Sequence, residues 1–418
     1  MEKSGKFRLT SLERNWILYD VGNSAFVLMV ATLIPIFFNA LAESGGLSSV
    51  EYLAYWGYAS SAVTVITAVL SPILGTVADT KGFKKPIFIL CVFVGIVGCC
   101  AMGAASAWLP FLVIFVIAKV GFSGSLVFYD SMLSDVTTPE RMDEVSSRGY
   151  AWGYIGSCVP FVVCLGLVLG AGSIGISQMT ALNLALLLTA AWWLLTTLPL
   201  LKSYKQLYYV EVEKHAVRQS FARIGHTLRH LPEDKQVFWF LLAFFCYIDG
   251  VYTIIDMATA YGTALGLDTT GLLLALLVTQ IVAFPSALVF GRLSNKYPSA
   301  KLIPVCIAAY AGIAVFAFFL TRQWQFWVLA VIVGMFQGGV QALSRSHFAK
   351  IIPPEKSGEY FGLFDICGKG ASFLGTMIVS VGSQLTGSAN VGVGSLIVLF
   401  IVGFVLFRVS CKKEVVPE

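Results

Sequence analysis

The sequence predicts an all-α membrane protein with twelve transmembrane helices in two six-helix halves. Three observations support this fold class. Hydrophobic residues make up 57% of the 418 residues and charged residues only 12%, whereas soluble domains are roughly half apolar and about a quarter charged. Apolar segments recur along the whole chain, and the basic residues gather in alternate loops between them.

The apolar segments are bounded by turn or charge signals and have the length of membrane spans. The first, from Trp16 to Leu41, is too long for a secretion signal and carries Asp20 and Asn23, so we interpret it as a retained helix. The twelve predicted helices lie near 15–41, 51–78, 86–106, 108–131, 147–170, 177–201, 236–262, 270–292, 302–321, 324–345, 358–384 and 391–409.

Most of the 28 Lys and Arg residues fall on one side of these helices. The exceptions are Lys119 and Lys369 within spans and Arg322 on the opposite side. Because cytoplasmic loops are enriched in basic residues, we expect both termini in the cytoplasm, in a protein of the plasma membrane. The longest polar stretch divides the chain into an N-terminal half (1–201), a cytoplasmic linker (202–235) and a C-terminal half (236–418).

The linker mixes basic and acidic residues and begins with three tyrosines, Tyr204, Tyr208 and Tyr209. Two interpretations are open for it. It could form an amphipathic helix on the lipid headgroups, or it could be a basic loop that only sets the topology.

Several classes of protein are disfavoured by composition. The net charge of +5 is too small for a nucleic-acid partner. The nine cysteines form no CxxC pair and the four histidines lie between apolar segments, which disfavours a metal site, a disulfide framework or a redox cofactor. No HExxH or GxSxG pattern occurs. We therefore expect a monomeric membrane protein that is not an enzyme and has no cofactor.

A short motif occurs once in each half. The second predicted helix is followed by the first copy, Gly75-Thr-Val-Ala-Asp79-Thr-Lys-Gly82-Phe-Lys84-Lys85. The eighth is followed by the second copy, Gly291-Arg-Leu-Ser-Asn295-Lys296, which has the same spacing from the glycine to the polar residue. Duplication of this kind is typical of transporters built from repeats. The first copy resembles the signature loop of the major facilitator superfamily. The resemblance implies a cytoplasmic gate formed by Gly75, Asp79, Lys84 and Lys85.

Four further stretches resemble the vacuole-effluxer-like permeases, which include the autophagy-related vacuolar amino-acid exporters of fungi and many bacterial relatives. They are Tyr19–Phe26, Ser146–Gly156, Tyr247–Val251 and Gln337–Ser346. The resemblance covers nearly the whole chain except the termini and the linker. It implies the major facilitator fold and the transport of a small polar solute such as an amino acid.

Polar residues also form stripes at helical spacing on four of the predicted helices. A charge at the bilayer centre costs about 2.5–3.5 kcal/mol on insertion scales, so these residues are expected to face a shared polar cavity. The candidate substrate or coupling residues are Asp20, Asn23, Lys119, Asp249, Tyr252, Thr253, Asp256, Gln337 and Gln341.

The depth of each charge in its helix suggests its role. Lys119 with Asp249 or Asp256 would offer a cation and an anion to a zwitterionic amino acid, and Asp249 could instead carry a proton. Asp130, Arg148 and Arg345 lie near the cytoplasmic ends, where we assign them to the gate. Asp20, Asp130 and Arg345 could form this inner gate or simply snorkel. Asp365 and Lys369 stand at i and i+4 on the eleventh helix, as an intrahelical pair would.

We therefore predict a secondary transporter that moves a small polar solute by alternating access, with proton coupling as an option. Two alternatives stay open. One is a multidrug or organic-ion exporter of the same superfamily, and the other is a membrane sensor that does not transport.

Overall fold

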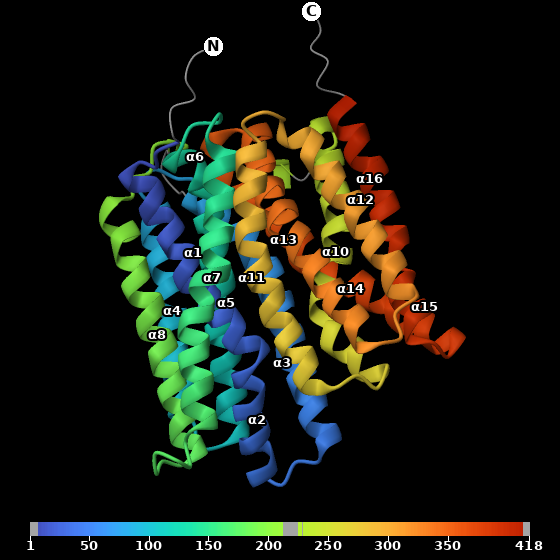
Figure 1. Ribbon diagram of the computed structural model, residues 1–418. Coiled ribbons are helices and arrows are strands. Elements are labelled where there is room, and N and C mark those ends of the chain that lie inside the picture. The colour runs from blue at the N-terminus through green and yellow to red at the C-terminus, as the bar shows by residue number, and fades with distance from the viewer. Residues whose placement is uncertain (1–6, 212–224, 228, 413–418) are drawn as a thin grey trace, which may run out of the picture.

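The computed structural model describes residues 7–211, 225–227 and 229–412. Within its helices, the backbone alone is described at 49–50, 53, 259–260, 264, 269–270, 273 and 369–373. The described chain is almost entirely helical, and the helices run roughly parallel in one bundle (Figure 1). This confirms the predicted all-α membrane fold.

The N-terminal half contains eight helical segments. They are α1 (Ser11–Ala31), α2 (Leu33–Ser44), α3 (Ser49–Ala78), α4 (Lys84–Gly103), α5 (Trp108–Ser131), the short α6 (Leu133–Val136), α7 (Met142–Leu169) and α8 (Gln178–Ser203). The predicted first helix is thus two segments that meet at Thr32, which has φ −131° and ψ −74°. Pro35 follows three residues later and has no N–H to donate to the preceding turn, which accounts for the break.

The C-terminal half repeats the arrangement. Its segments are α10 (Lys235–Ala264), α11 (Thr269–Leu293), α12 (Ser299–Phe318), α13 (Gln323–Ile351), the 3₁₀ turn η1 (Pro354–Lys356), α14 (Ser357–Thr386), α15 (Ala389–Gly394) and α16 (Ile397–Lys412). The division of the chain at residues 202–235 stays a prediction.

Eleven stretches of the described chain are long and apolar enough to cross a membrane. α14 also has the length of a membrane span, with 30 residues, although its side chains at 369–373 lie outside the described part of the chain. It carries Glu359 and Asp365 together with six glycines. α14 runs along α3, where Asp365 meets Ser71.

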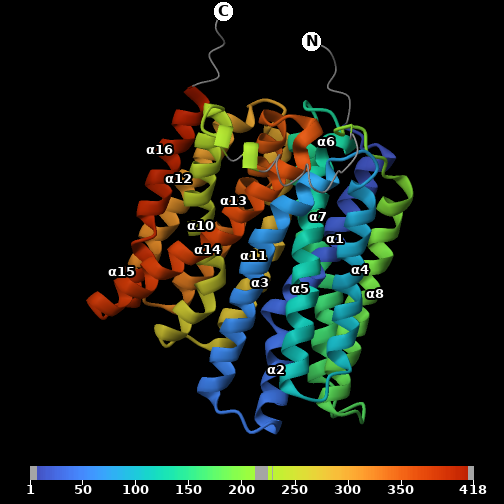
Figure 2. The same ribbon diagram turned by 180° about the vertical axis from the view of Figure 1, so that it is seen from behind.

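The halves meet mainly through two groups of contacts, with smaller contributions from α5 against α14 and from α6 against α13. α3 packs against α14, and α7 packs against α11 and α13, as seen from both sides of the molecule (Figures 1 and 2). The start of α1 and the end of α16 lie at the same end of the bundle (Figure 1), which we call the termini side; the opposite end is the far side.

Candidate transport pathway and gate

The first layer of contacts between the halves lies where α3 meets α14 on the termini side. A Cβ atom on Gly75 would stand only 2.1 Å from the carbonyl oxygen of Gly358, so the two helices touch backbone to backbone. At the end of α3, the buried carboxylate of Asp79 accepts hydrogen bonds from the backbone N–H groups of Gly358 (2.7 Å) and Glu359 (2.8 Å). Asp79 thereby caps the positive end of α14.

Lys84, the first of the two adjacent lysines that end the motif, completes this layer. Its ammonium is fully buried, donates to Ser357 Oγ (2.8 Å), and lies 3.5 Å from Asp135 and 3.8 Å from Asp79. The single Lys84 ammonium therefore interacts with two carboxylates, those of Asp79 and Asp135. Burial raises the pKa of Asp79 to about 7, and Lys84 and the two backbone N–H groups oppose that rise. Lys85 is only half-buried and stands outside this ion-pair group.

The beginning of the linker is bound to the same layer. Asp135 accepts hydrogen bonds from the backbone N–H groups of Leu207 and Tyr208, both at 2.9 Å, and from the Tyr204 hydroxyl at 2.5 Å. Val210 donates its N–H to the carbonyl of Asp79 at 2.8 Å. Residues 204–210 thus form an extended strap across the motif loop, which neither interpretation of the linker predicted. The following residues, 212–224, lie outside the described part of the chain.

The second copy of the motif meets α7 in the corresponding place. Asn295 donates to the Glu144 carboxylate at 2.8 Å, near the start of α7. In this second contact the carboxylate belongs to α7 and the donor to the motif loop. In the first copy the carboxylate, Asp79, belongs to the motif and the donors belong to α14. Arg148 binds Glu144 of its own helix at 2.5 Å and so contributes to this contact through that carboxylate. Asp143 pairs with Lys350 of α13 at 2.6 Å.

A second layer lies deeper in the bundle and centres on Arg345 of α13. Its guanidinium is 2.9 Å from Asp130 of α5 and 3.7 Å from Asp20 of α1, and it donates to the hydroxyl and carbonyl of Ser146 on α7. Only 2% of the arginine side chain is exposed. Arg345 does not snorkel to the surface; it crosses from one half into the other.

Aromatic rings enclose the same guanidinium. Its carbon lies 4.3 Å from the ring centroid of Tyr150 and 4.7 Å from that of Trp16, distances at which cation–π attraction acts. Gly149 leaves the space for this approach, because a Cβ atom there would lie 3.0 Å from Asp20 and 3.1 Å from Arg345. The structure therefore brings Asp20, Asp130 and Arg345 together as one group.

Asp249 lies in the middle of α10 and is fully buried. Both of its carboxylate oxygens lie 2.9 Å from the backbone nitrogen of Gly375 on α14, and the Thr253 hydroxyl donates to one of them at 3.3 Å. A Cβ atom on Gly375 would be 2.1 Å from Thr253 Oγ1. Asp249 therefore packs within the C-terminal half.

Asp256 lies two helical turns further along α10 and has a different environment. It is exposed to solvent although it stands among the helices, and Lys119 of α5 acts on it electrostatically from the other half. The Lys119 ammonium also lies 4.8 Å from the ring centroid of Phe122. Of the two acids proposed as partners of Lys119, Asp256 is thus the one on which Lys119 acts electrostatically; we call Lys119 and Asp256 the central pair.

The remaining predicted site residues make contacts of several kinds. Asn23 donates to the carbonyl of Tyr19 in its own helix, and Gln341 accepts from Tyr154 across the two halves. Tyr252 is half-buried. Asp365 accepts from Ser71 of α3 at 2.8 Å, whereas the side chain of Lys369 lies outside the described residues, so the pairing of these two stays a prediction.

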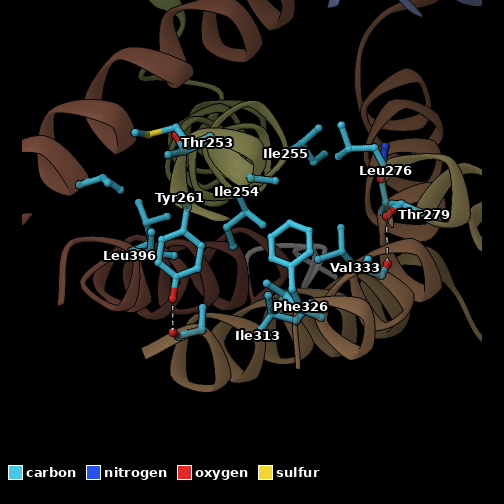
Figure 3. Close-up of a pocket in the computed structure, with 18 of the residues that line it drawn as sticks. Thr253, Ile254, Ile255, Tyr261, Leu276, Thr279, Ile313, Phe326, Val333 and Leu396 are labelled. Carbon is cyan, nitrogen blue, oxygen red and sulfur yellow. Dashed lines mark hydrogen bonds between the residues drawn. The ribbon is translucent and has the colours of Figure 1, made fainter. Parts of the chain in front are cut away.

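A cavity of about 60 Å³ opens inside the C-terminal half (Figure 3). Its walls are mostly apolar, and the Tyr261 hydroxyl at its edge donates to the Ala317 carbonyl. Thr253 and Gln337 contribute polar atoms, and the buried side-chain oxygen of Gln337 has no hydrogen-bond partner among the described residues. The cavity therefore borders the Asp249 site without containing its carboxylate.

Sequence reasoning missed several residues of these layers. Asp135, Ser146 and Gly375 act through backbone or hydroxyl contacts to distant helices, and no local pattern signals such partners. Glu144 was recognisable only as an acid in the first turn of a helix.

These layers join helices α1, α3, α5 and α7 to helices α13 and α14. The model of the vacuole effluxer Atg22-like family matches residues 11–140 and 134–414. The chain belongs to this family of major facilitator superfamily transporters. The Atg22-like chain is therefore a multi-pass membrane protein and a secondary transporter, not an enzyme.

Individual relatives agree with this assignment. The Atg22-like chain is 42% identical over 404 residues to the uncharacterized MFS-type transporter YxiO of Bacillus subtilis, covering 96% of this chain and 94% of the relative. It is 25% identical to autophagy-related protein 22 of Coccidioides immitis, of which it spans about half the length (51%). The crystal structure of the MFS transporter FucP in the outward conformation has the same fold, with a TM-score of 0.71 at 16% identity, covering 96% of this chain and 97% of that one.

Proposed function

We propose that this transporter carries a small zwitterionic solute of the amino-acid class, and that the central pair binds it. The observation that carries the proposal is the position of Lys119 and Asp256. Lys119 of one half is close enough to Asp256 of the other half to act on it electrostatically, and the Asp256 side chain is exposed. An α-carboxylate and an α-ammonium would satisfy these two charges without placing a net charge in the bilayer.

The proposal includes the orientation in the membrane. The termini side faces the cytoplasm of the cell, because most Lys and Arg residues flank the helices there. The gate layers hold the halves together on that side, and the exposure of Asp256 supports access from the far side. The chain works as a monomer in the plasma membrane, and a proton accompanies the solute.

Counterflow in proteoliposomes tests the solute class. Labelled amino acids, sugars and organic acids are offered to vesicles preloaded with the unlabelled compound, with and without a pH gradient. We expect exchange of amino acids alone. Exchange of organic anions or large cations instead would favour the exporter alternative, and no exchange of any solute would favour a sensor.

Two variants locate the binding charges. Lys119→Gln and Asp256→Asn should each reduce amino-acid counterflow at least tenfold, because the loss of one charge–charge hydrogen bond costs about 1.5–3 kcal/mol. The matched control is Glu43→Gln, an exposed acid at the far end of α2, which should exchange like the native chain. Unchanged exchange by both central-pair variants would contradict the proposal.

A further inference from the structure

The strap, residues 204–210, pairs with the loop that follows Asp79. Val210 donates its N–H to the Asp79 carbonyl at 2.8 Å, and the carbonyl of Val210 accepts from the Lys81 N–H at 3.3 Å. These two hydrogen bonds form a parallel β-bridge between Thr80 and Val210. The strap thus fixes the backbone next to the carboxylate that caps α14.

Gln206 ties the strap to the same loop a second time. Its side-chain amide donates to the Ala78 carbonyl at 3.1 Å, and its side-chain oxygen accepts from the Gly82 N–H at 3.0 Å. Ala78 precedes Asp79 in the chain and Gly82 follows it. One strap side chain therefore holds the loop on both sides of the acid that contacts the other half.

The strap also occupies the Asp135 carboxylate, which lies beside Lys84. One oxygen of Asp135 accepts from two strap N–H groups, and the other accepts from the Tyr204 hydroxyl. A carboxylate has about four acceptor positions, so the strap fills most of them. Lys84 remains 3.5 Å from Asp135, too far for an ordinary hydrogen bond, and donates to Ser357 at the start of α14.

Opening of the gate removes this partner of Lys84. Once Ser357 has moved away with α14, the ammonium has only carboxylates to bind, and a full hydrogen bond to Asp135 competes with the strap for that carboxylate. Coupling between two binding events is reciprocal. A docked strap therefore favours the contact of Lys84 with Ser357, and with it the closed gate.

Little apolar surface holds the strap in place. Leu207 is 60% exposed and Tyr208 is 40% exposed, and of the side chains at 204–210 Tyr204 alone is buried. Extended segments that are fixed by a few hydrogen bonds open locally at a lower cost than packed helices. The strap can therefore leave the loop while the N-terminal half stays folded.

We propose that the strap is a brake on the gate. It binds the motif loop while the termini side is closed, and it leaves the loop before the halves separate there. The brake rests on the alternating access of the proposed function, but it depends neither on the identity of the solute nor on that of the coupled ion. A force that draws the linker away from the loop speeds the opening of the gate.

Hydrogen–deuterium exchange of the full chain measures gate opening without any solute. The N–H groups of Gly358 and Glu359 bind Asp79 across the two halves, so they exchange when that contact breaks. A peptide that covers residues 357–362 reports on the gate, and a peptide that covers 204–210 reports on the strap.

The double variant Tyr204→Phe/Gln206→Ala loosens the strap without removing a charge or changing α14. We expect the amides of Gly358 and Glu359 to exchange at least about fivefold faster than in the native chain, at the lower end of the coupling between two sites. The matched control is Lys205→Ala, at the exposed strap position between the two changes, which should exchange like the native chain.

The double variant Thr80→Cys/Val210→Cys locks the strap in place. Paired strands lie about 4.8 Å apart, within the range of about 4.4–6.8 Å between the Cα atoms of a disulfide. The oxidised variant should exchange at Gly358 and Glu359 at least about fivefold more slowly than the reduced variant. The native chain, oxidised and reduced in parallel, controls for its own cysteines.

Two results would overturn the proposal. One is unchanged exchange at 357–362 in a loosened variant whose strap peptide exchanges faster, because the strap would then move independently of the gate. The other is equal exchange at 357–362 in the oxidised and reduced forms of the locked variant, because the strap would then travel with the N-terminal half.

The two variants support each other. If the loosened variant does not fold or keeps its strap docked, the locked variant decides, and if the disulfide does not form, the loosened variant decides. A gate that the strap controls as expected, in a chain that exchanges no amino acid, would refute the proposed solute and leave this inference intact.

Discussion

Gly75 of α3 and Gly358 of α14 meet backbone to backbone, with 2.1 Å between the position of a Gly75 Cβ atom and the Gly358 carbonyl oxygen. Real Cβ atoms do not approach a carbonyl this closely, so a side chain at position 75 would force the two helices apart. This contact forms part of the outermost layer between α3 and α14 on the termini side.

Gly75→Ala should therefore keep the gate open. The added methyl group separates α3 from α14 and withdraws Asp79 from the N–H groups of Gly358 and Glu359. The closed state then loses the close helix packing and these two hydrogen bonds, which destabilises it by about 1–3 kcal/mol. The measurement is the distance between spin labels attached at Glu140→Cys and Glu355→Cys, two exposed positions near the termini side, by pulsed electron paramagnetic resonance. Gly57→Ala on the same helix, where a Cβ atom meets nothing within 4 Å, is the control and should keep the native distance.

Lys84→Met should destabilise the protein by about 3–5 kcal/mol, because Asp79 and Asp135 would be left buried without their cation. Thermal unfolding in detergent measures the loss as a lower Tm. Lys85→Met at the half-buried neighbouring position is the control. Equal Tm values for the two variants would show that the buried ammonium contributes no net stability.

Gly375→Ala should disrupt the Asp249 site. A Cβ atom there would lie 2.1 Å from Thr253 Oγ1 and 2.7 Å from Asp249 Oδ1, so α10 and α14 must separate and the backbone hydrogen bond to the carboxylate is lost. We expect a cost of about 1–3 kcal/mol, seen as a lower Tm and reduced counterflow. Gly166→Ala on α7, which has open space around the position, should leave both close to native; a native Tm for Gly375→Ala would contradict the packing described.

Asp135→Ala should release the linker strap. Residues 204–208 lose three hydrogen bonds to this carboxylate, and their amides should exchange with deuterium faster. Hydrogen–deuterium exchange with mass spectrometry of peptides covering 204–210 measures this. Glu211→Gln removes only the exposed ion pair with Lys81, worth about 0–1 kcal/mol, and should leave the exchange of 204–208 unchanged.

Much of the fold was predictable because the bilayer constrains the composition of each membrane-spanning segment separately. Each span must be apolar over about 20 residues whatever its neighbours are, so length and hydropathy locate it. The break at Thr32 was missed, because the apolar run from Trp16 to Leu41 continues through it and a proline within a membrane span does not by itself end a helix. The gate was expected for another reason, namely the resemblance of the motif that begins at Gly75 to the signature loop of the major facilitator superfamily.

The partners of the charged residues could not be predicted in this way. The helical stripe on α10 marked Asp249 and Asp256 as equivalent, since both lie on one face at a spacing of seven residues. Only the packing of α14, which brings the Gly375 N–H against Asp249, separates their environments. Arg345 lies near a helix end, where snorkelling to the surface was an equally reasonable expectation. Only the tertiary contacts with Asp20 and Asp130 show that its guanidinium reaches residues of the other half.

The sequence by itself determined that this chain crosses the membrane many times, which residues are too polar to face lipid, and where the loops carry their charge, because the bilayer acts on each segment independently. The tertiary structure decided which of those polar residues meet. A buried charge is stabilised by whatever group lies within a few ångströms of it, and for Arg345, Lys84 and Asp249 those groups come from helices far away in the chain.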